Sequence, residues 1–179
     1  MRVLFLAGWN CIRFFLLRLY CPGFKAKVGQ LCGLNTRIVV KKTSEVTFGK
    51  RIVSDGRLTI IVQGDGRLEI GDHVYFNENM MISCIERVSI GANCLFGPHV
   101  CIYDSNHEYS AETGVKPTSQ TASVSIGTGC WIGANTVILK GSTIGNNCVI
   151  GAGCIVSGNI PDGSIVTMER KLKVRKIGE

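Results

Sequence analysis

Residues 126–161 read IGTGCWIGANTVILKGSTIGNNCVIGAGCIVSGNIP and divide into six hexads, each opened by an aliphatic residue. Gly follows the opening residue in four of the six hexads. The fifth position is mostly small, with Cys130, Thr136, Ser142, Cys148, Cys154 and Ile160. A period of six fits neither a helix nor the alternation of a plain strand. A short fixed period indicates a solenoid, and hexapeptide repeats indicate a parallel β-helix.

Each hexad is expected to form one short strand and one turn, so that three hexads close a triangular coil. The opening aliphatic residue and the small fifth residue would point inward and stack on the same positions of the next coil. Gly and Asn in the turns accept backbone angles that other residues resist. Glycine-rich low complexity would not hold an aliphatic residue in register, and a phosphate-binding loop would need a strand before it and a helix after it.

The repeat continues upstream, where apolar residues open hexads at Ile70, Phe76 and Ile82 and, after a two-residue slip at 86–88, at Ile90, Phe96 and Ile102. Residues 28–68 carry a ragged version of the repeat and are expected to form the first coils. Residues 103–123 interrupt it, and loops of that length in a compact domain are usually functional or disordered. We therefore predict an all-β solenoid over 28–167, with one long loop at 103–123.

Both ends of the chain are basic. Residues 1–51 carry ten Lys or Arg against one acid, within a formal net charge of +7. Residues 168–179 form a basic tail. This distribution predicts anionic partners at the ends, and the absence of an RNA- or DNA-binding motif argues against nucleic acid.

Residues 1–27 predict a hydrophobic, basic N-terminal helix ahead of the solenoid. The longest uncharged run, from Val3 to Ile12, is short for a membrane span, and no small-residue cleavage site precedes Pro22. Two arrangements are expected for residues 1–21, and they are compatible with each other. In one, the helix caps the solenoid core. In the other, the helix lies in the membrane interface with its arginines facing lipid headgroups.

Nine cysteines raise the question of disulfides or metal binding. Four of them, Cys94, Cys130, Cys148 and Cys154, occupy the small inward place of a hexad, where Cys acts as a compact apolar residue. No CxxC spacing occurs. The pattern predicts reduced, structural thiols in a cytoplasmic protein and no metal site.

Three histidines are candidates for proton transfer. His73 and His99 fall in predicted turns of the solenoid. His107 lies in the long loop, within Asp104-Ser-Asn-His107-Glu108. A neighbouring carboxylate can set the tautomer and the pKa of a histidine, so His107 is the candidate general base.

Residues 74–107, VYFNENMMISCIERVSIGANCLFGPHVCIYDSNH, resemble the active-site segment of galactoside and maltose O-acetyltransferases. These enzymes belong to the hexapeptide-repeat acyltransferases, as do polysaccharide O-acetyltransferases. The resemblance implies a left-handed parallel β-helix, with His107 as catalytic base and Asn77 binding the reacting group. It also implies an acetyl-CoA groove lined by Trp131, Ala134, Gly151, Ala152, Ser157 and Gly158. Lys140 or the basic tail, with Lys173 and Arg175, would meet the CoA phosphates.

The activity implied is direct acetyl transfer from acetyl-CoA to a sugar hydroxyl, without a metal. His107 would deprotonate the acceptor, Asp104 or Glu108 would orient His107, and Asn77 with backbone N–H groups would stabilise the oxyanion. The resemblance further implies a homotrimer whose active sites lie between chains. The hydrophobic N-terminus suggests a surface polysaccharide or lipid-linked sugar as acceptor, and a cytoplasmic protein with peripheral contact at the inner face of the membrane.

Other activities stay open from the sequence alone. One is N-acetylation of a nucleotide-linked amino sugar. Another is serine O-acetylation, although residues 1–27 are too short for the helical domain that such enzymes usually carry. The third is a non-catalytic or carbonic-anhydrase-like hexapeptide scaffold, which would need clustered metal-binding histidines that His73, His99 and His107 do not suggest.

Overall fold

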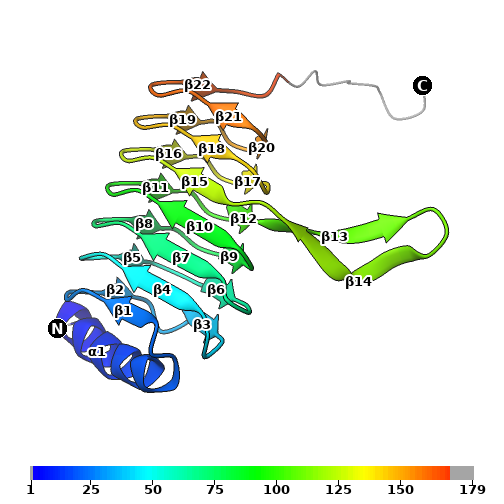
Figure 1. The fold of residues 1–179 in the computed structure, drawn as a ribbon. Coiled ribbons are helices and arrows are strands. Elements are labelled where there is room, and N and C mark those ends of the chain that lie inside the picture. Colours follow the sequence, from blue (N-terminus) through cyan, green and yellow to red (C-terminus); the bar gives the residue numbers. More distant parts are fainter. Residues whose placement is uncertain (1, 170–179) are drawn as a thin grey trace, which may run out of the picture.

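The computed structural model describes residues 2–169, which form a left-handed parallel β-helix capped at one end by a helix (Figure 1). Sheet 1 contains β1 (Phe24–Ala26), β4 (Glu45–Phe48), β7 (Arg67–Ile70), β10 (Arg87–Ile90), β15 (Val124–Ile126), β18 (Thr143–Ile144) and β21 (Asn159–Ile160). Sheet 2 contains β2 (Leu31–Cys32), β5 (Val53–Ser54), β8 (Tyr75–Phe76), β11 (Leu95–Phe96), β16 (Trp131–Ile132), β19 (Val149–Ile150) and β22 (Ile165–Val166). Sheet 3 contains β3 (Arg37–Val40), β6 (Leu58–Val62), β9 (Met80–Cys84), β12 (Cys101–Tyr103), β17 (Val137–Ile138) and β20 (Ile155–Val156).

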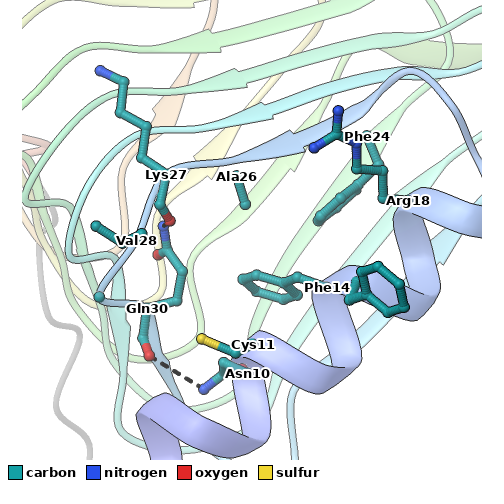
Figure 2. Close-up of a pocket in the computed structure, with 11 residues that line it drawn as sticks. Asn10, Cys11, Phe14, Arg18, Phe24, Ala26, Lys27, Val28 and Gln30 are labelled. Carbon is teal, nitrogen blue, oxygen red and sulfur yellow. Dashed lines mark hydrogen bonds between the residues drawn. The ribbon is translucent and has the colours of Figure 1, made fainter.

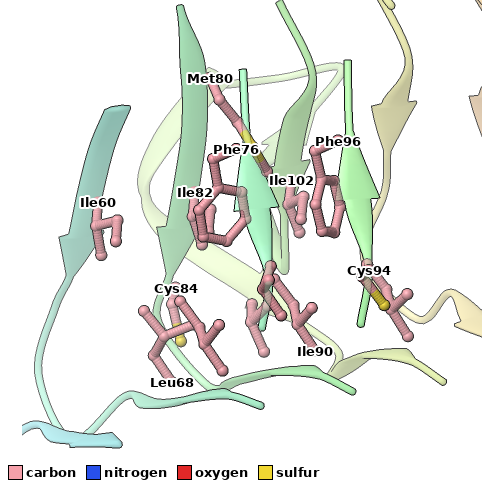
Figure 3. Packing of buried hydrophobic residues seen from close by; sticks show 14 of the residues in the cluster. Ile60, Leu68, Phe76, Met80, Ile82, Cys84, Ile90, Cys94, Phe96 and Ile102 are labelled. Atoms are coloured by element: carbon pink, nitrogen blue, oxygen red, sulfur yellow. The ribbon is translucent and has the colours of Figure 1, made fainter. Parts of the chain in front are cut away.

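The hexad pattern predicts the core correctly. All six opening aliphatic residues between Ile126 and Val156 are at most 3% exposed. The small residues at the fifth position are buried as well, except Ile160, which is half-buried. Larger side chains fill the earlier coils, where the rings of Phe76 and Phe96 lie 5.2 Å apart between successive coils (Figure 3). A parallel stack of coils with aligned inward positions therefore buries one continuous column of side chains on each sheet.

The ragged repeat of residues 28–68 has a simple geometric cause, which is that the early coils are longer than the late ones. In the last coils Ser125 pairs with Thr143, and the coil between them consists of three plain hexads. In the first coils Val46 pairs with Leu68 across a longer stretch of chain. The slip at 86–88 belongs to the next coil, which is of intermediate length. The extra residues lengthen the strands of sheet 3 and the turns that follow them, while the inward positions stay aligned.

The predicted loop at 103–123 is an antiparallel β-hairpin rather than an irregular segment. It consists of β13 (Ser105–Ser110) and β14 (Gly114–Thr121) and projects away from the solenoid between β12 and β15 (Figure 1). At its base, the N–H of Ala122 donates to the carbonyl of Asp104 over 2.9 Å, so the chain leaves and rejoins the solenoid at one point.

The inward cysteines form a ladder of thiol hydrogen bonds. The thiols of Cys94, Cys130 and Cys148 donate to carbonyl oxygens of Gly127, Gly145 and Pro161 over 3.0–3.1 Å. Burial raises the pKa of Cys94 to about 11 and also raises the pKa of Cys130. All nine cysteines are free thiols, and Cys94 and Cys130 stay protonated and unreactive near neutral pH.

Replacing Cys130 with alanine should lower the free energy of unfolding by roughly 1 kcal/mol without loss of catalysis, because it removes one buried hydrogen bond and a small volume. Denaturant unfolding followed by circular dichroism measures the change. Cys11→Ala, at an exposed position of the N-terminal helix, is the control and should leave stability unchanged. Stoichiometric zinc in the purified protein would contradict the packing role.

Helix α1 (Arg2–Tyr20) lies across the open end of the solenoid (Figure 1). Its Phe14 packs against Phe24 and Phe48 of the first two coils, with ring centroids 5.4 and 5.7 Å apart. The side-chain amide of Asn10 donates to the carbonyl of Cys32 over 2.9 Å. The cap expected for residues 1–21 is therefore present; the helix ends at Tyr20, and residues 24–26 already form the first strand.

Candidate functional site

The predicted site residues lie along two different edges of the triangular solenoid. The hairpin edge is where sheet 3 meets sheet 1, and it carries residues 85–86, the hairpin, and the turns at 139–142 and 157–158. The Asn77 edge is where sheet 2 meets sheet 3, and it carries the turns at 77–79, 97–99, 133–135 and 151–153. These two edges border opposite ends of the strands of sheet 3.

Asp104 anchors the hairpin to the preceding coil. Its side chain is fully buried, and the N–H of Ile85 donates to both carboxylate oxygens over 2.9 and 3.0 Å. The N–H of Glu86 donates to Oδ2 over 2.8 Å. These bonds occupy the carboxylate that was expected to orient His107. The structure thus gives Asp104 a positioning role, in which it sets where the hairpin leaves the solenoid.

Asp104→Ala should destabilise the protein by about 1–3 kcal/mol, because two part-buried N–H groups lose their acceptor. Limited proteolysis should then cut the hairpin faster than it cuts the wild type, and thermal unfolding should report the loss of stability. Asp162→Ala is the matched control, since its exposed carboxylate accepts a comparable pair of bonds from Asn146. Equal proteolysis of the hairpin in Asp104→Ala and wild type would refute the anchoring role.

His107 is exposed on β13, opposite Ser119 of β14, beside an irregularity in the pairing between His107 and Tyr109. The neighbouring Glu108 is already engaged, since the hydroxyl of Thr118 donates to its Oε2 over 2.7 Å. Among the described residues, no hydrogen bond joins the imidazole to Asp104, Glu108 or any other group. The exposed imidazole is therefore available to a substrate.

A groove of about 620 Å³ lies between the hairpin and the end of sheet 3, with His107 in its wall. Its lining is rich in hydroxyl and amide groups, contributed by Gln63, Ser83, Tyr103, Ser105, Asn106 and Ser119. Burial raises the pKa of Tyr103, so its phenol stays a neutral donor near neutral pH. Such a surface of neutral donors and acceptors is suited to a polyhydroxylated ligand.

Asn77 follows β8 on the Asn77 edge. Its side-chain Oδ1 accepts the N–H of Glu78 over 2.8 Å, and this bond orients the amide. Its NH₂ group makes no hydrogen bond to the described residues. An amide held through its oxygen presents its nitrogen as a donor, which is what an oxyanion requires.

The Asn77 edge is a stack of turns with small residues. The N–H of His99 donates to Glu78, that of Asn135 to Pro98, and that of Gly153 to Ala134, over 2.7–3.0 Å. The third residue of each turn is left-handed, with φ of 56° at Asn79, 59° at His99 and 57° at Asn135. His99 is thus a turn residue, as predicted, and so is the exposed His73, with φ of 59°.

The expected acetyl-CoA residues divide between the two edges. Ala134, Gly151 and Ala152 lie in turns of the Asn77 edge, and Trp131 projects from adjacent sheet 2 with 56% of its surface exposed. Ser157, Gly158 and Lys140 lie on the hairpin edge with His107. Lys173 and Arg175 lie outside the described residues.

Glycine packing keeps the Asn77 edge smooth. A Cβ at Gly133 would come within 2.6 Å of the backbone nitrogen of Ala152, and one at Gly97 within 2.7 Å of that of Ala134. The turns consequently stack at backbone distance, and an extended chain can lie along them beside Trp131. A flat track of this kind beside the exposed indole of Trp131 has room for an extended ligand.

One chain cannot bring His107 and Asn77 to the same reacting atom. The edges are separated by the strands of sheet 3, of which β9 has five residues and therefore extends about 16 Å. The sequence-based resemblance implied active sites between chains but did not assign His107 and Asn77 to separate edges. Sequence reasoning also missed the groove hydroxyls of Ser83 and Tyr103, which come from two different coils. Only the outward position of these residues on their strands could have indicated them.

The described residues contain no group of three or more His, Cys, Asp or Glu suited to a metal ion.

The sequence and fold of this chain are similar to those of known proteins. Residues 123–158 match the family described as bacterial transferase hexapeptide (six repeats). The chain is 30% identical over 146 residues to WbbJ of Escherichia coli K12, named for O-acetyl transfer in lipopolysaccharide biosynthesis, covering 74% of each chain. It is 34% identical over 112 residues to the galactoside O-acetyltransferase of the same organism, covering 63% of this chain but only 55% of the relative.

Among solved structures, the hexapeptide-repeat acetyltransferase VCA0836 from Vibrio cholerae O1 biovar eltor, in complex with acetyl coenzyme A, superimposes with a TM-score of 0.54. The match covers 87% of this chain and 71% of VCA0836 at 24% identity, and so it bears on the fold. The long match to WbbJ, together with the matched repeats at 123–158, is what assigns the family. The chain belongs to the hexapeptide-repeat acyltransferases.

Proposed function

We propose that this protein transfers an acetyl group from acetyl-CoA to a hydroxyl group of a sugar, and that the sugar belongs to a surface polysaccharide or its lipid-linked precursor. The observation that carries the proposal is the groove of hydroxyl and amide groups around the exposed imidazole of His107. WbbJ and the galactoside O-acetyltransferase bear names that refer to acetyl transfer to oxygen, which supports the same acceptor chemistry.

In this reaction His107 takes the proton from the acceptor hydroxyl, and the hydroxyl oxygen attacks the acetyl carbonyl carbon. The carbon–sulfur bond of the thioester then breaks, and the proton passes to the departing thiolate. The NH₂ group of Asn77, oriented through the bond from Glu78, donates to the oxyanion of the tetrahedral intermediate. Trp131 packs against the pantetheine arm, and Lys140 or the basic tail meets the phosphates of CoA.

The proposal requires two chains at each site, because His107 and Asn77 lie on separate edges. The outward residues support a cyclic trimer. On sheet 1 they are polar or charged, such as Glu45, Arg67, Glu69 and Arg87. On sheet 2 they form an apolar column in strict register, with Leu31, Val53, Tyr75, Leu95, Trp131, Val149 and Ile165.

Sheet 3 also has a largely apolar outer face, with Ile61, Met81, Tyr103, Val137 and Ile155. A ring of identical chains joins two different faces of each chain head to tail. This chain has two such apolar faces, which meet at the Asn77 edge, and one polar face left for solvent. The mechanism further requires that the hairpin edge of one chain lies near the Asn77 edge of its neighbour, so that the two edges complete one site.

Release of CoA thiol from acetyl-CoA, measured with a panel of acceptors, tests the function. The panel contains neutral sugars, amino sugars, nucleotide-linked amino sugars, lipid-linked oligosaccharides and serine. Thiol release that depends on a sugar hydroxyl, with an O-acetyl product by mass spectrometry, is the expected result. An N-acetylated amino sugar or O-acetylserine as the preferred product would refute the proposed acceptor.

A further inference from the structure

Helix α1 exposes an apolar side to solvent and turns polar side chains toward the solenoid, unlike an ordinary surface helix. Its contact stripe on the solenoid includes the polar residues Asn10 and Arg13, which bond to carbonyl groups of Cys32 and Thr36 over 2.9 and 3.1 Å. Its solvent side is instead apolar, with exposed fractions of 44–80% for Val3, Leu4, Phe5, Trp9, Ile12, Phe15, Leu16, Leu19 and Tyr20. A water-exposed helix normally shows the opposite arrangement.

The charged residues around this apolar face are mostly basic, with Asp55 as an acidic neighbour of Phe5 and Leu6. Residues 2–44, which form α1 and the first coil, contain eight Lys or Arg and no acidic residue. Exposed cations in the first coil include Lys25, Lys27, Arg37, Lys41 and Lys42. The ammonium group of Lys42 lies 5.9 Å from the ring of Tyr20, next to the end of the helix. An apolar surface with a basic surround matches an anionic lipid bilayer in both respects.

A pocket of about 230 Å³ between α1 and the first coil shows the same combination (Figure 2). Aromatic and aliphatic groups of Phe14, Phe24 and Val28 line it, together with the cationic Arg18 and Lys27. Lys27 also forms an ion pair with Asp72 over 3.2 Å, so Arg18 is the cation of this pocket without an acidic partner among the described residues. This chemistry suits a lipid, with an apolar tail segment against the rings and a phosphate near the cations.

We propose that the outer face of α1, with the basic first coil, docks this protein end-on upon an anionic lipid bilayer. The helix lies in the plane of the interface. By length and apolar composition, residues 3–20 could also cross a membrane. Crossing would strip Phe14 from the core and break the bonds of Asn10 and Arg13 to the first coil, so the structure favours the in-plane arrangement.

End-on docking sets the solenoid axis along the membrane normal, because α1 lies across the end of the solenoid (Figure 1). Trp9 on α1 then sits at the lipid surface. Trp131 lies on β16, four strands along sheet 2 from the terminal strand β2. This spacing puts Trp131 about 19 Å from the first coil. The two tryptophans are both exposed, so they report depth independently.

The first test is co-flotation of the full-length protein with vesicles containing phosphatidylglycerol or with pure phosphatidylcholine vesicles. Wild type should float with the anionic vesicles. A double variant that removes apolar surface, Phe15→Gln with Leu19→Gln, should weaken vesicle binding at least tenfold. A double variant that removes charge, Lys41→Gln with Lys42→Gln, should weaken it by about 25-fold, since each lysine contributes about fivefold. Tyr109→Gln with Val115→Gln, on the exposed hairpin, is the matched control and should bind like wild type.

The second test uses vesicles with brominated acyl chains, which quench nearby tryptophan fluorescence. Trp131→Phe, which retains Trp9, should be quenched, and Trp9→Phe, which retains Trp131, should not. Absence of flotation, equal quenching of both tryptophans, or resistance to alkaline extraction would overturn the proposal. So would self-association through this face, seen as a larger species that Phe15→Gln with Leu19→Gln abolishes. None of these readouts depends on acetyl transfer, so docking and the proposed function can fail separately.

Discussion

His107→Ala should lower kcat/KM for acetyl transfer by about 10²–10⁴-fold, the usual contribution of a general base. The fold and the affinity for CoA should stay unchanged, because the side chain is exposed on the hairpin and bonds to no described residue. Thiol release with the best acceptor measures the rate, and calorimetry measures CoA binding. Loss of CoA binding in parallel with activity would show a binding role in place of proton transfer.

The matched control is His99→Asn. His99 occupies the left-handed place in its turn that Asn79 and Asn135 occupy in other coils, so Asn fits there without strain. Its activity should equal that of wild type. Near wild-type turnover in His107→Ala together with an inactive His99→Asn would make His99 the base and refute the mechanism.

Mixing two inactive variants should restore activity. His107→Ala keeps Asn77, and Asn77→Ala keeps His107, so a trimer assembled from both contains some interfaces with both groups intact. Random assembly from an equal mixture gives an intact interface about one time in four, and activity should recover to about a quarter of wild type. The proteins are mixed, unfolded and refolded together, and thiol release is compared with each variant refolded alone.

Two controls separate assembly from chemistry in this experiment. Analytical ultracentrifugation at micromolar concentration should show a trimer for each variant and for the mixture. A mixture of His107→Ala with the double variant Asn77→Ala, His107→Ala should stay inactive, because no chain then supplies the base. Trimers without recovered activity would show that His107 and Asn77 do not act in one site, and a monomer would refute the shared site itself.

The core of the fold could be predicted from the sequence because it depends on a local, repeated rule. Each coil needs an aliphatic residue and a small residue at fixed places, so Ile126, Cys130 and their equivalents are recognisable from spacing alone. His73 and His99 were also correctly assigned to turns. The early coils were harder to place, since their greater length obscures the period while leaving the inward positions, such as Val46 and Leu68, aligned.

The partners of individual site residues could not be predicted in this way. Asp104 stands shortly before His107 in the chain and was expected to orient it, yet its carboxylate bonds to the N–H groups of Ile85 and Glu86. A buried carboxylate binds the unpaired donors that surround it, and those donors belong to the preceding coil. The neighbour in sequence is therefore not the neighbour in space.

The sequence by itself determined the β-helix, its inward columns, its N-terminal helix and the candidates His107 and Asn77. The tertiary structure decided how these parts face one another. It placed the two candidates on separate edges, joined two apolar sheets at one of them, and turned Asn10 and Arg13 of α1 inward so that its apolar side faces out. The repeat depends on contacts between equivalent positions of successive coils, which the sequence shows directly. The direction in which each edge, sheet or helix side points depends instead on how the sheets and the helix pack once the coils have formed.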